Sequence, residues 1–213
     1  MIITMGDRVP IIGISRHRLE TDGEGITTLV AFHSCPLRCR YCLNPQSIND
    51  VTDKVKWYKC EELYEKVKID ELYFLATNGG VTFGGGEPML RHRFINEFRK
   101  LCGENWRIYV ETSLNVPQEC LCSLLDVVDG WIVDVKDMNS IIYRNYTGND
   151  NALVVDNLQL LCDNSHQHNT LIRLPHIPGF NTYDDRLRSR ERLEKMGFER
   201  YDMFDYIKRC HDE

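Results

Sequence analysis

The sequence predicts a single α/β domain with a mainly parallel sheet, and three observations support that fold class. The chain has 213 residues, which is enough for one sizeable hydrophobic core. Strand-like segments alternate with segments of helical periodicity, as is typical of parallel sheets whose faces are covered by helices. No repeat, low-complexity tract or Pro/Ser-rich linker divides the chain. We therefore expect residues 1–213 to form one domain that ends in a short tail at 208–213.

The predicted strands are short runs rich in apolar and β-branched residues. The first reads Ile-Thr-Thr-Leu-Val-Ala-Phe and leads directly into a cysteine-rich loop. The second is broken sharply by three consecutive glycines, Gly84, Gly85 and Gly86. The six expected strands lie at 26–32, 81–83, 107–111, 131–135, 171–174 and 201–207.

The predicted helices fill the segments between these strands. They lie at 60–75, 90–101, 118–125, in a stretch ending near 161, and at 183–196. The apolar positions with helical spacing on the first two are Leu63, Val67, Leu72, Leu75, Phe94, Phe98 and Leu101. About six βα units in this length predict a partial, open TIM-like barrel rather than a closed eight-stranded one.

The overall composition describes an ordinary soluble protein. Hydrophobic residues make up 42% of the chain and charged residues 27%, and the net charge is -6. This charge gives no general attraction for nucleic acid or for an acidic membrane surface. No apolar run has the length of a membrane span, and the first residues lack a signal-peptide pattern. We expect a cytoplasmic monomer.

Three of the nine cysteines lie close together in the loop after the first strand. Cys35, Cys39 and Cys42 fall within eight residues, and clustered thiolates select zinc, copper or iron–sulfur clusters. A zinc site needs a fourth ligand, which His33 or Cys60 could supply. The remaining cysteines are interpreted as mostly buried small hydrophobes, with Cys120 and Cys122 on different faces of a helix. The scattered ones are Cys60, Cys102, Cys162 and Cys210.

Polar and glycine residues follow the end of each later predicted strand. Ligands of open parallel sheets bind at the carboxyl ends of the strands, so these residues are expected to meet at one site. They are Gly84 to Glu87, Glu111, Thr112, Ser113, Asp134, Lys136 and Arg173.

The spacing of the three cysteines, with aromatic Tyr41 before the last, resembles the C-x3-C-x-aromatic-C motif of the radical S-adenosylmethionine (SAM) enzymes. The run G-G-G-E-P at 84–88 is similar to their glycine–glycine–glutamate motif. The resemblance narrows to the activating enzymes of glycyl-radical enzymes, the group that includes the activases of pyruvate formate-lyase and anaerobic ribonucleotide reductase. It extends from about Thr21 to Gly179.

Four further segments carry the narrower resemblance. D-G-E-G-I-T at 22–27 is similar to D-G-P-G-I/T-R, with Glu24 replacing Pro and Thr27 replacing Arg. C-P-L-R-C-R-Y-C-L-N-P at 35–45 is close to the activase form, with Leu43 replacing His. The segments 111–113 and 134–136 match D/E-T-N/S and D-x-K, and Arg173 with Pro178-Gly179 matches I-R…P-G.

The resemblance implies a role for each matching residue. Cys35, Cys39 and Cys42 would hold three irons of one 4Fe-4S cluster, leaving the fourth iron to the amino and carboxylate groups of SAM. Gly85, Gly86 and Glu87 would bind that amino group and Lys136 the carboxylate, while the backbone of Tyr41 would approach the adenine. The remaining residues implied in the SAM site are Glu111, Thr112, Asp134 and Arg173. The first three of these can also hold a monovalent cation.

The implied activity is reductive cleavage of SAM, followed by removal of a hydrogen atom from a glycine of a partner glycyl-radical enzyme. A flavodoxin or ferredoxin-type protein would donate the electron. One alternative is a radical SAM enzyme that acts on a small molecule or peptide, and another is a non-catalytic zinc or cluster-binding module. The chain departs from the activases in lacking a histidine that matches their C-terminal SAM contact. His211 lies in the tail, and we assign it no role.

Overall fold

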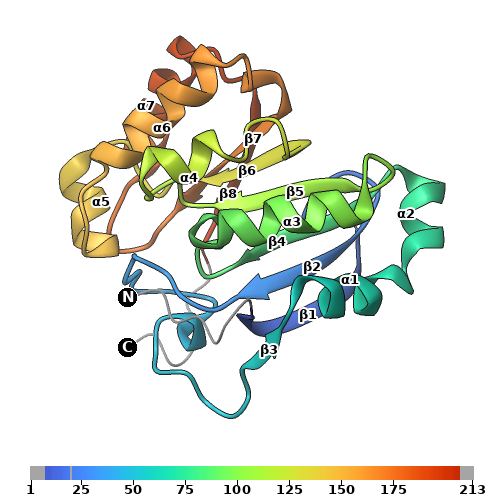
Figure 1. Ribbon diagram of the computed structural model, residues 1–213. Helices are drawn as coiled ribbons and strands as arrows, with labels where there is room; N and C mark the ends of the chain where they lie inside the picture. The colour runs from blue at the N-terminus through green and yellow to red at the C-terminus, as the bar shows by residue number, and fades with distance from the viewer. Residues whose placement is uncertain (1–7, 20, 207–213) are drawn as a thin grey trace.

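Eight strands form one curved sheet in the computed structural model, which describes residues 8–19 and 21–206. They are β1 (Val9–Leu19), β2 (Ile26–Phe32), β3 (Lys56–Tyr58), β4 (Gly80–Gly85), β5 (Arg107–Thr112), β6 (Gly130–Asp134), β7 (Thr170–His176) and β8 (Arg200–Asp205). The strand order is β3-β1-β2-β4-β5-β6-β7-β8. The six strands β2, β4, β5, β6, β7 and β8 run parallel, whereas β1 is antiparallel to both β2 and β3. Because β3 and β8 are the two ends of this order, the sheet is an open barrel (Figure 1).

Helices connect the parallel strands and cover one face of the sheet (Figure 1). The α-helices are α1 (Cys60–Lys68), α2 (Glu71–Thr77), α3 (His92–Cys102), α4 (Gln118–Cys122), α5 (Ser140–Thr147), α6 (Ala152–Asp163) and α7 (Tyr183–Lys195). The 3-10 helices are η1 (Pro45–Ser47), η2 (Pro88–Arg91) and η3 (Gln167–Asn169). No helix among the described residues is both long and apolar enough to span a bilayer.

The predicted α/β class, the six parallel strands and the open barrel are confirmed, and the sheet gains two strands that the sequence did not indicate. Strand β1 was missed because its second half is polar and largely exposed, so it lacks the apolar signal of a buried strand. Tertiary contacts hold this half: Arg16 donates from Nε to both carboxylate oxygens of Asp70 over 2.9 Å.

The single helix expected at 60–75 is wrong, because the chain turns at Asp70 between α1 and α2. The side chain of Asp70 is fully buried and also accepts a 2.8 Å hydrogen bond from Thr28. The turn rotates the second segment, so Leu72 is 76% exposed while Phe74 enters the core. Leu75, expected to follow the same helical face, is also exposed.

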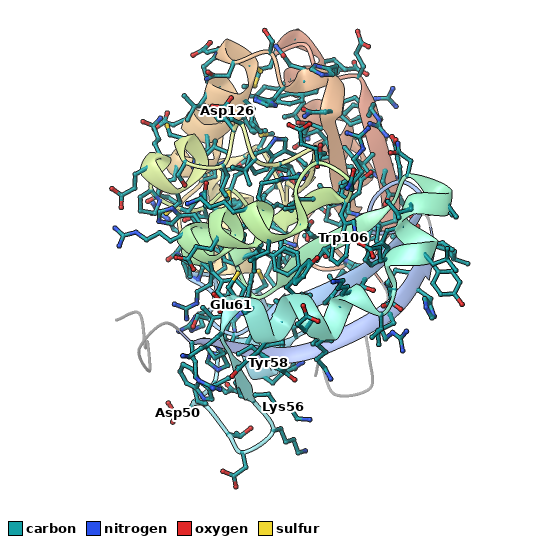
Figure 2. All side chains as sticks on the ribbon, turned by 45° about the vertical axis from the view of Figure 1, so that its right-hand side comes forward. Asp50, Lys56, Tyr58, Glu61, Trp106 and Asp126 are labelled. Atoms are coloured by element: carbon teal, nitrogen blue, oxygen red, sulfur yellow. The ribbon has the colours of Figure 1, made fainter. Side chains whose placement is uncertain are left out.

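The helix expected at 90–101 begins as η2 and continues as α3. Phe94 and Phe98 are buried as predicted, but Leu101 is 38% exposed. The fully buried Trp106 packs against Phe74, Phe98 and Tyr64, with ring centroids 5.1–6.3 Å apart. Figure 2 shows Trp106 in the interior beneath the helices. This aromatic group fixes the helices against β4 and β5.

The scattered cysteines largely follow the prediction. Cys60 and Cys102 are buried and Cys162 is half-buried, while Cys210 lies outside the described residues. Cys120 is buried and Cys122 is exposed, so the two do lie on different faces of α4.

Candidate active site

A cavity of about 360 Å³ opens at the carboxyl ends of the parallel strands. It gathers residues from the cysteine loop and from the ends of β4, β5, β6 and β7. The residues that the sequence analysis singled out and that line this cavity are Cys35, Cys39, Tyr41, Cys42, Gly85, Gly86, Glu111, Thr112, Asp134, Lys136 and Arg173.

The cysteine loop follows β2 directly and has no regular secondary structure at residues 33–39. Neighbouring backbone holds it instead: the amides of Arg38 and Arg40 donate to the carbonyls of Thr147 and Tyr146 at the end of α5, over 2.8 and 3.1 Å. Burial raises the pKa of the Cys35 thiol to about 12 and that of Cys39 to about 11. Thiolates in such surroundings require a compensating cation, which a bound metal centre provides.

The glycines at the end of β4 allow that strand to touch the cysteine loop. Gly85 has a φ of +95°, which disfavours any residue with a Cβ. A Cβ on Gly86 would lie 2.2 Å from the carbonyl oxygen of Ser34, the residue before the first cysteine. Asn44, just after the third cysteine, donates from its side chain to the carbonyl of Gly85 over 3.1 Å. The glycine motif therefore joins the strand to both ends of the loop.

Glu87 occupies a different position from the one implied for it. Its side chain is fully buried, and it is not among the residues that line the cavity. Its carboxylate accepts hydrogen bonds from the hydroxyls of Thr112 and Ser113, both at 2.7 Å, and from the amide of Ser113 at 3.0 Å. Burial raises the pKa of this carboxyl group, although the donors oppose the shift. In this geometry Glu87 holds the end of β5 in place, since its carboxylate faces β5 rather than the cavity.

Two ion pairs lie in the cavity wall. Lys136 donates to Asp134, and Arg173 donates to Glu111 and to the carbonyl of Thr21. Burial alone would lower the pKa of Lys136, but the nearby Asp134 carboxylate outweighs it and the pKa is raised. Burial also raises the pKa of Glu111, opposed by Arg173. The second oxygen of Asp134, Oδ1, is buried and has no hydrogen-bond partner among the described residues.

Aromatic side chains also line the cavity, among them Tyr41, Tyr146 and Tyr206. The Tyr41 hydroxyl donates to the carbonyl of Pro178 over 3.2 Å. The ring centroid of Tyr41 lies 5.5–6.0 Å from the ring centroids of Tyr146, Phe180 and Tyr206. The cavity lining thus combines polar and charged groups with aromatic and aliphatic groups, as is usual for small-molecule sites.

Several lining residues were missed by the sequence analysis. Asp202, Phe204 and Tyr206 line the cavity from β8 and the residue after it, and Asn44 lines it from a loop. The β8 residues carried a usable signal, because alternate residues of a strand share one face. The predicted sixth strand already contained all three.

The two candidates for a fourth zinc ligand are engaged elsewhere. The ring of His33 is buried and lies 3.0 Å, by Nε2, from the carbonyl oxygen of Asn49. The thiol of Cys60 lies in the core and contacts the carbonyl of Phe94. Neither residue is among those that line the cavity. The cavity is therefore lined by three thiols, the ammonium of Lys136 and the carbonyl-bearing residues Gly85 and Gly86, which fits an iron–sulfur cluster with a ligand bearing amino and carboxylate groups.

The family model of the Radical SAM superfamily matches residues 29–193, which is most of the chain. The chain belongs to the radical SAM superfamily, and the cofactors of that family are a 4Fe-4S cluster and SAM. Within it, the chain is similar to activating enzymes of glycyl-radical enzymes. It is 31% identical over 205 residues to the pyruvate formate-lyase 2-activating enzyme of Escherichia coli (strain K12), covering 82% of this chain and 68% of that one.

A second relative is the 4-hydroxyphenylacetate decarboxylase activating enzyme of Clostridium scatologenes, 28% identical over 225 residues, covering 77% of this chain and 72% of that one. Among solved structures, Streptococcus suis SuiB bound to S-adenosylmethionine aligns with a TM-score of 0.64 at 12% identity. The match covers 86% of this chain and 43% of SuiB, so the chain spans less than half of that protein. The structure of anSMEcpe with bound AdoMet aligns with a TM-score of 0.59 at 18% identity, covering 84% of this chain and 50% of that one. These likenesses establish the fold.

Proposed function

We propose that this chain is an activating enzyme that generates a glycyl radical on a partner protein. One observation carries the proposal: the three cysteines, Lys136 and Asp134 line a single cavity at the strand ends. The similarity to activating enzymes supports the protein substrate. When bound, the cluster and SAM would supply the one-electron chemistry by which a hydrogen atom is removed from the substrate.

The residues of the chain bind and orient these groups. Cys35, Cys39 and Cys42 hold the cluster, and the ammonium of Lys136 attracts the SAM carboxylate as a point charge. Asp134 keeps Lys136 protonated, since its carboxylate raises the pKa of that amine. The backbone carbonyls of Gly85 and Gly86 would accept hydrogen bonds from the SAM amino group. Glu111, Thr112 and Arg173 complete the wall on the polar side.

The open side of the barrel suits a peptide loop as substrate. Leu43 is 55% exposed and also lines the cavity, so its side chain lies at the entrance. Pro175 and Phe204 line the cavity from β7 and β8. These apolar side chains would contact a peptide loop that enters the cavity and would help to keep water away from the reacting groups.

The proposal extends to properties that follow from this function. We infer that residues 1–213 act as one radical SAM core domain with one 4Fe-4S cluster, reduced by a flavodoxin or ferredoxin-type protein. Glu111, Thr112 and Asp134 are proposed to admit a monovalent cation, since hard cations prefer oxygen ligands. A cytoplasmic monomer remains our expectation.

Anaerobic reconstitution with iron and sulfide tests the proposal. The reconstituted protein is incubated with reductant, SAM and a panel of glycyl-radical enzymes of the formate-lyase and decarboxylase types. We expect 5'-deoxyadenosine, methionine and the doublet electron paramagnetic resonance signal of a glycyl radical on one partner. The Cys39→Ala variant should give none of these, and the surface variant Cys122→Ala should behave as wild type.

The other outcomes separate the competing functions. SAM cleavage without a glycyl radical on any partner would favour an enzyme that acts on a small molecule or a peptide. Retention of zinc with no SAM cleavage would indicate a non-catalytic metal module. Full iron content in the Cys39→Ala variant would refute the assignment of the ligands.

A further inference from the structure

A buried arginine lies directly behind the cysteine loop. Arg91 is the last residue of η2, and its side chain is only 5% exposed. Its Nη2 donates a long hydrogen bond, 3.3 Å, to the hydroxyl of Ser34. The other two guanidinium nitrogens, Nε and Nη1, are buried and have no hydrogen-bond partner among the described residues.

No carboxylate in the described part of the chain lies within ion-pair distance of Arg91. Removing a guanidinium from water without a counter-charge is costly, and folded proteins rarely tolerate it. The charge of Arg91 therefore requires a compensating negative charge that the described side chains do not provide.

The contact between Arg91 and Ser34 connects this charge to the metal loop. Ser34 immediately precedes Cys35 and has a φ of +88°, a strained value for a residue with a Cβ. Its amide donates to the carbonyl of Ser47 over 2.9 Å, and its carbonyl accepts from the amide of Glu87 over 2.8 Å. Arg91 donates a hydrogen bond to the hydroxyl of Ser34, and Nδ1 of His33 lies 3.2 Å from the same hydroxyl.

We propose that Arg91 is a positioning residue that supplies the buried positive charge for the iron–sulfur cluster on the adjacent loop, and that this charge favours the reduced cluster. The inference rests on the proposed function, because it needs the cluster to be bound. Three thiolates make the loaded site anionic, and reduction adds one electron and hence one more negative charge. A fixed cation nearby stabilises the more negative form, so it raises the reduction potential. No bond forms or breaks in this step, and the electron comes from a low-potential one-electron donor such as dithionite.

The test compares three variants in a redox titration followed by electron paramagnetic resonance, without SAM or a partner protein. Arg91→Met keeps an unbranched side chain and removes the charge, whereas Arg91→Lys keeps the charge. Arg93→Met removes the same charge from an exposed position two residues away. For Arg91→Met we expect about a tenfold lower ratio of reduced to oxidised cluster at a fixed potential, which is about 59 mV for one electron. Arg91→Lys and Arg93→Met should match the wild type.

Chemical unfolding of the cluster-free protein provides a second readout. If Arg91 is kept for the cluster, Arg91→Met removes an uncompensated buried charge, so the cluster-free variant should be at least as stable as the wild type. Loss of stability in that form would mean that Arg91 is an ordinary structural residue, and would overturn the proposal.

The remaining outcomes are also decisive. An unchanged potential in Arg91→Met, or equal shifts in Arg91→Met and Arg91→Lys, would contradict the proposal. If Arg91→Met binds no iron, unchanged stability of its cluster-free form supports the proposal, and reduced stability opposes it. Because neither readout involves SAM cleavage or a glycyl radical, these results are separate from any failure of the proposed activity.

Discussion

The side-chain amide of Asn44 donates a hydrogen bond to the carbonyl oxygen of Gly85 across 3.1 Å. This contact joins the segment after the third cysteine to the end of β4, although the two residues are 41 positions apart in the chain. It orients the carbonyl of a residue that lines the cavity, and we assign that carbonyl to the SAM amino group.

Replacing Asn44 by Ala should weaken SAM binding without loss of iron. One neutral hydrogen bond contributes about 1 kcal/mol, so the dissociation constant for SAM should rise about fivefold. Calorimetric titration of the reconstituted protein measures this change. The exposed Asn145→Ala variant serves as the control and should bind as the wild type does. If Asn44→Ala and Asn145→Ala bind SAM with equal affinity, Asn44 does not orient the site.

Replacing Glu87 by Gln should destabilise the cluster-free protein. The buried carboxylate accepts hydrogen bonds from Thr112, Ser113 and Met89, and an amide group cannot accept all of them. We expect a loss of about 2–3 kcal/mol in the free energy of unfolding, measured by urea titration. The exposed Glu97→Gln variant should lose almost none. A Glu87→Gln variant with wild-type stability but weak SAM binding would instead favour a direct contact with SAM.

Replacing Lys136 by Met should weaken SAM binding more strongly than the Asn44 variant does. Hydrogen bonds to charged groups contribute about 1.5–3 kcal/mol, so a loss of at least about tenfold in affinity is expected. Iron content should stay unchanged, because Lys136 is not a cluster ligand in our assignment. Lys100→Met, at an exposed position, is the matched control. Unaltered affinity in Lys136→Met would remove this residue from the SAM site.

The pair of Arg173 and Glu111 should behave as a coupled unit. A double-mutant cycle with Arg173→Gln and Glu111→Gln, measured by urea unfolding of the cluster-free protein, should give a coupling energy of about 1–3 kcal/mol. The exposed pair of Arg190 and Glu194, 2.8 Å apart on α7, should give less than about 0.5 kcal/mol. Equal coupling in the two cycles would contradict a stronger interaction in the half-buried pair of Arg173 and Glu111.

Asp70 should give the protein a stability that depends on pH. Burial alone would raise the pKa of this carboxyl group, but hydrogen bonds from Arg16 and Thr28 outweigh it and the pKa is lowered. A lowered pKa contributes stability above the unfolded value, about 3.9, and this contribution is lost as the pH falls through the lower folded value.

The Asp70→Asn variant should therefore unfold about 2 kcal/mol more easily than the wild type at pH 7. This difference should shrink as the pH is lowered through the acid range, where both proteins come to carry an uncharged group at the site. The exposed Asp126→Asn variant should follow the wild type throughout, in denaturant titrations at each pH. A difference that is independent of pH would mean that the charge of Asp70 is not what stabilises the fold.

Much of the parallel sheet was predictable, because its buried strands carry continuous apolar and β-branched runs. The first predicted strand, 26–32, coincides with β2. Strand β1 was not predictable, since Arg16 and His17 are stabilised by Asp70, which is 54 and 53 positions away, rather than by local pattern. The end of the helix near Asp70 has a similar cause. The long-range contacts of the buried Asp70 carboxylate determine the local structure there, and not the helical spacing of Leu72 and Leu75.

The sequence predicted most of the residues that form the candidate site, but not the directions of their side chains. The cysteine spacing and the strand ends identified most of the polar residues that line the cavity. The position of Glu87 could not be inferred, because a motif gives the residue type and not the direction of the side chain. The sequence also offered no reason to single out Arg91, because this residue lies in an ordinary charged stretch at the start of a predicted helix. Only burial distinguishes it from Arg93.

The segment 21–25, which precedes β2, reaches across to the other end of the open sheet. Arg173 of β7 donates to the carbonyl of Thr21, and Arg200 forms an ion pair of 3.0 Å with Glu24. Arg200 is the first residue of β8, so this ion pair lies at the amino ends of the parallel strands, whereas the cavity lies at their carboxyl ends. Among the described residues, these two contacts tie the segment before β2 to β7 and β8, which lie on the far side of the parallel sheet. Part of what keeps the barrel curved is therefore a set of charged side chains outside the backbone ladder of the strands.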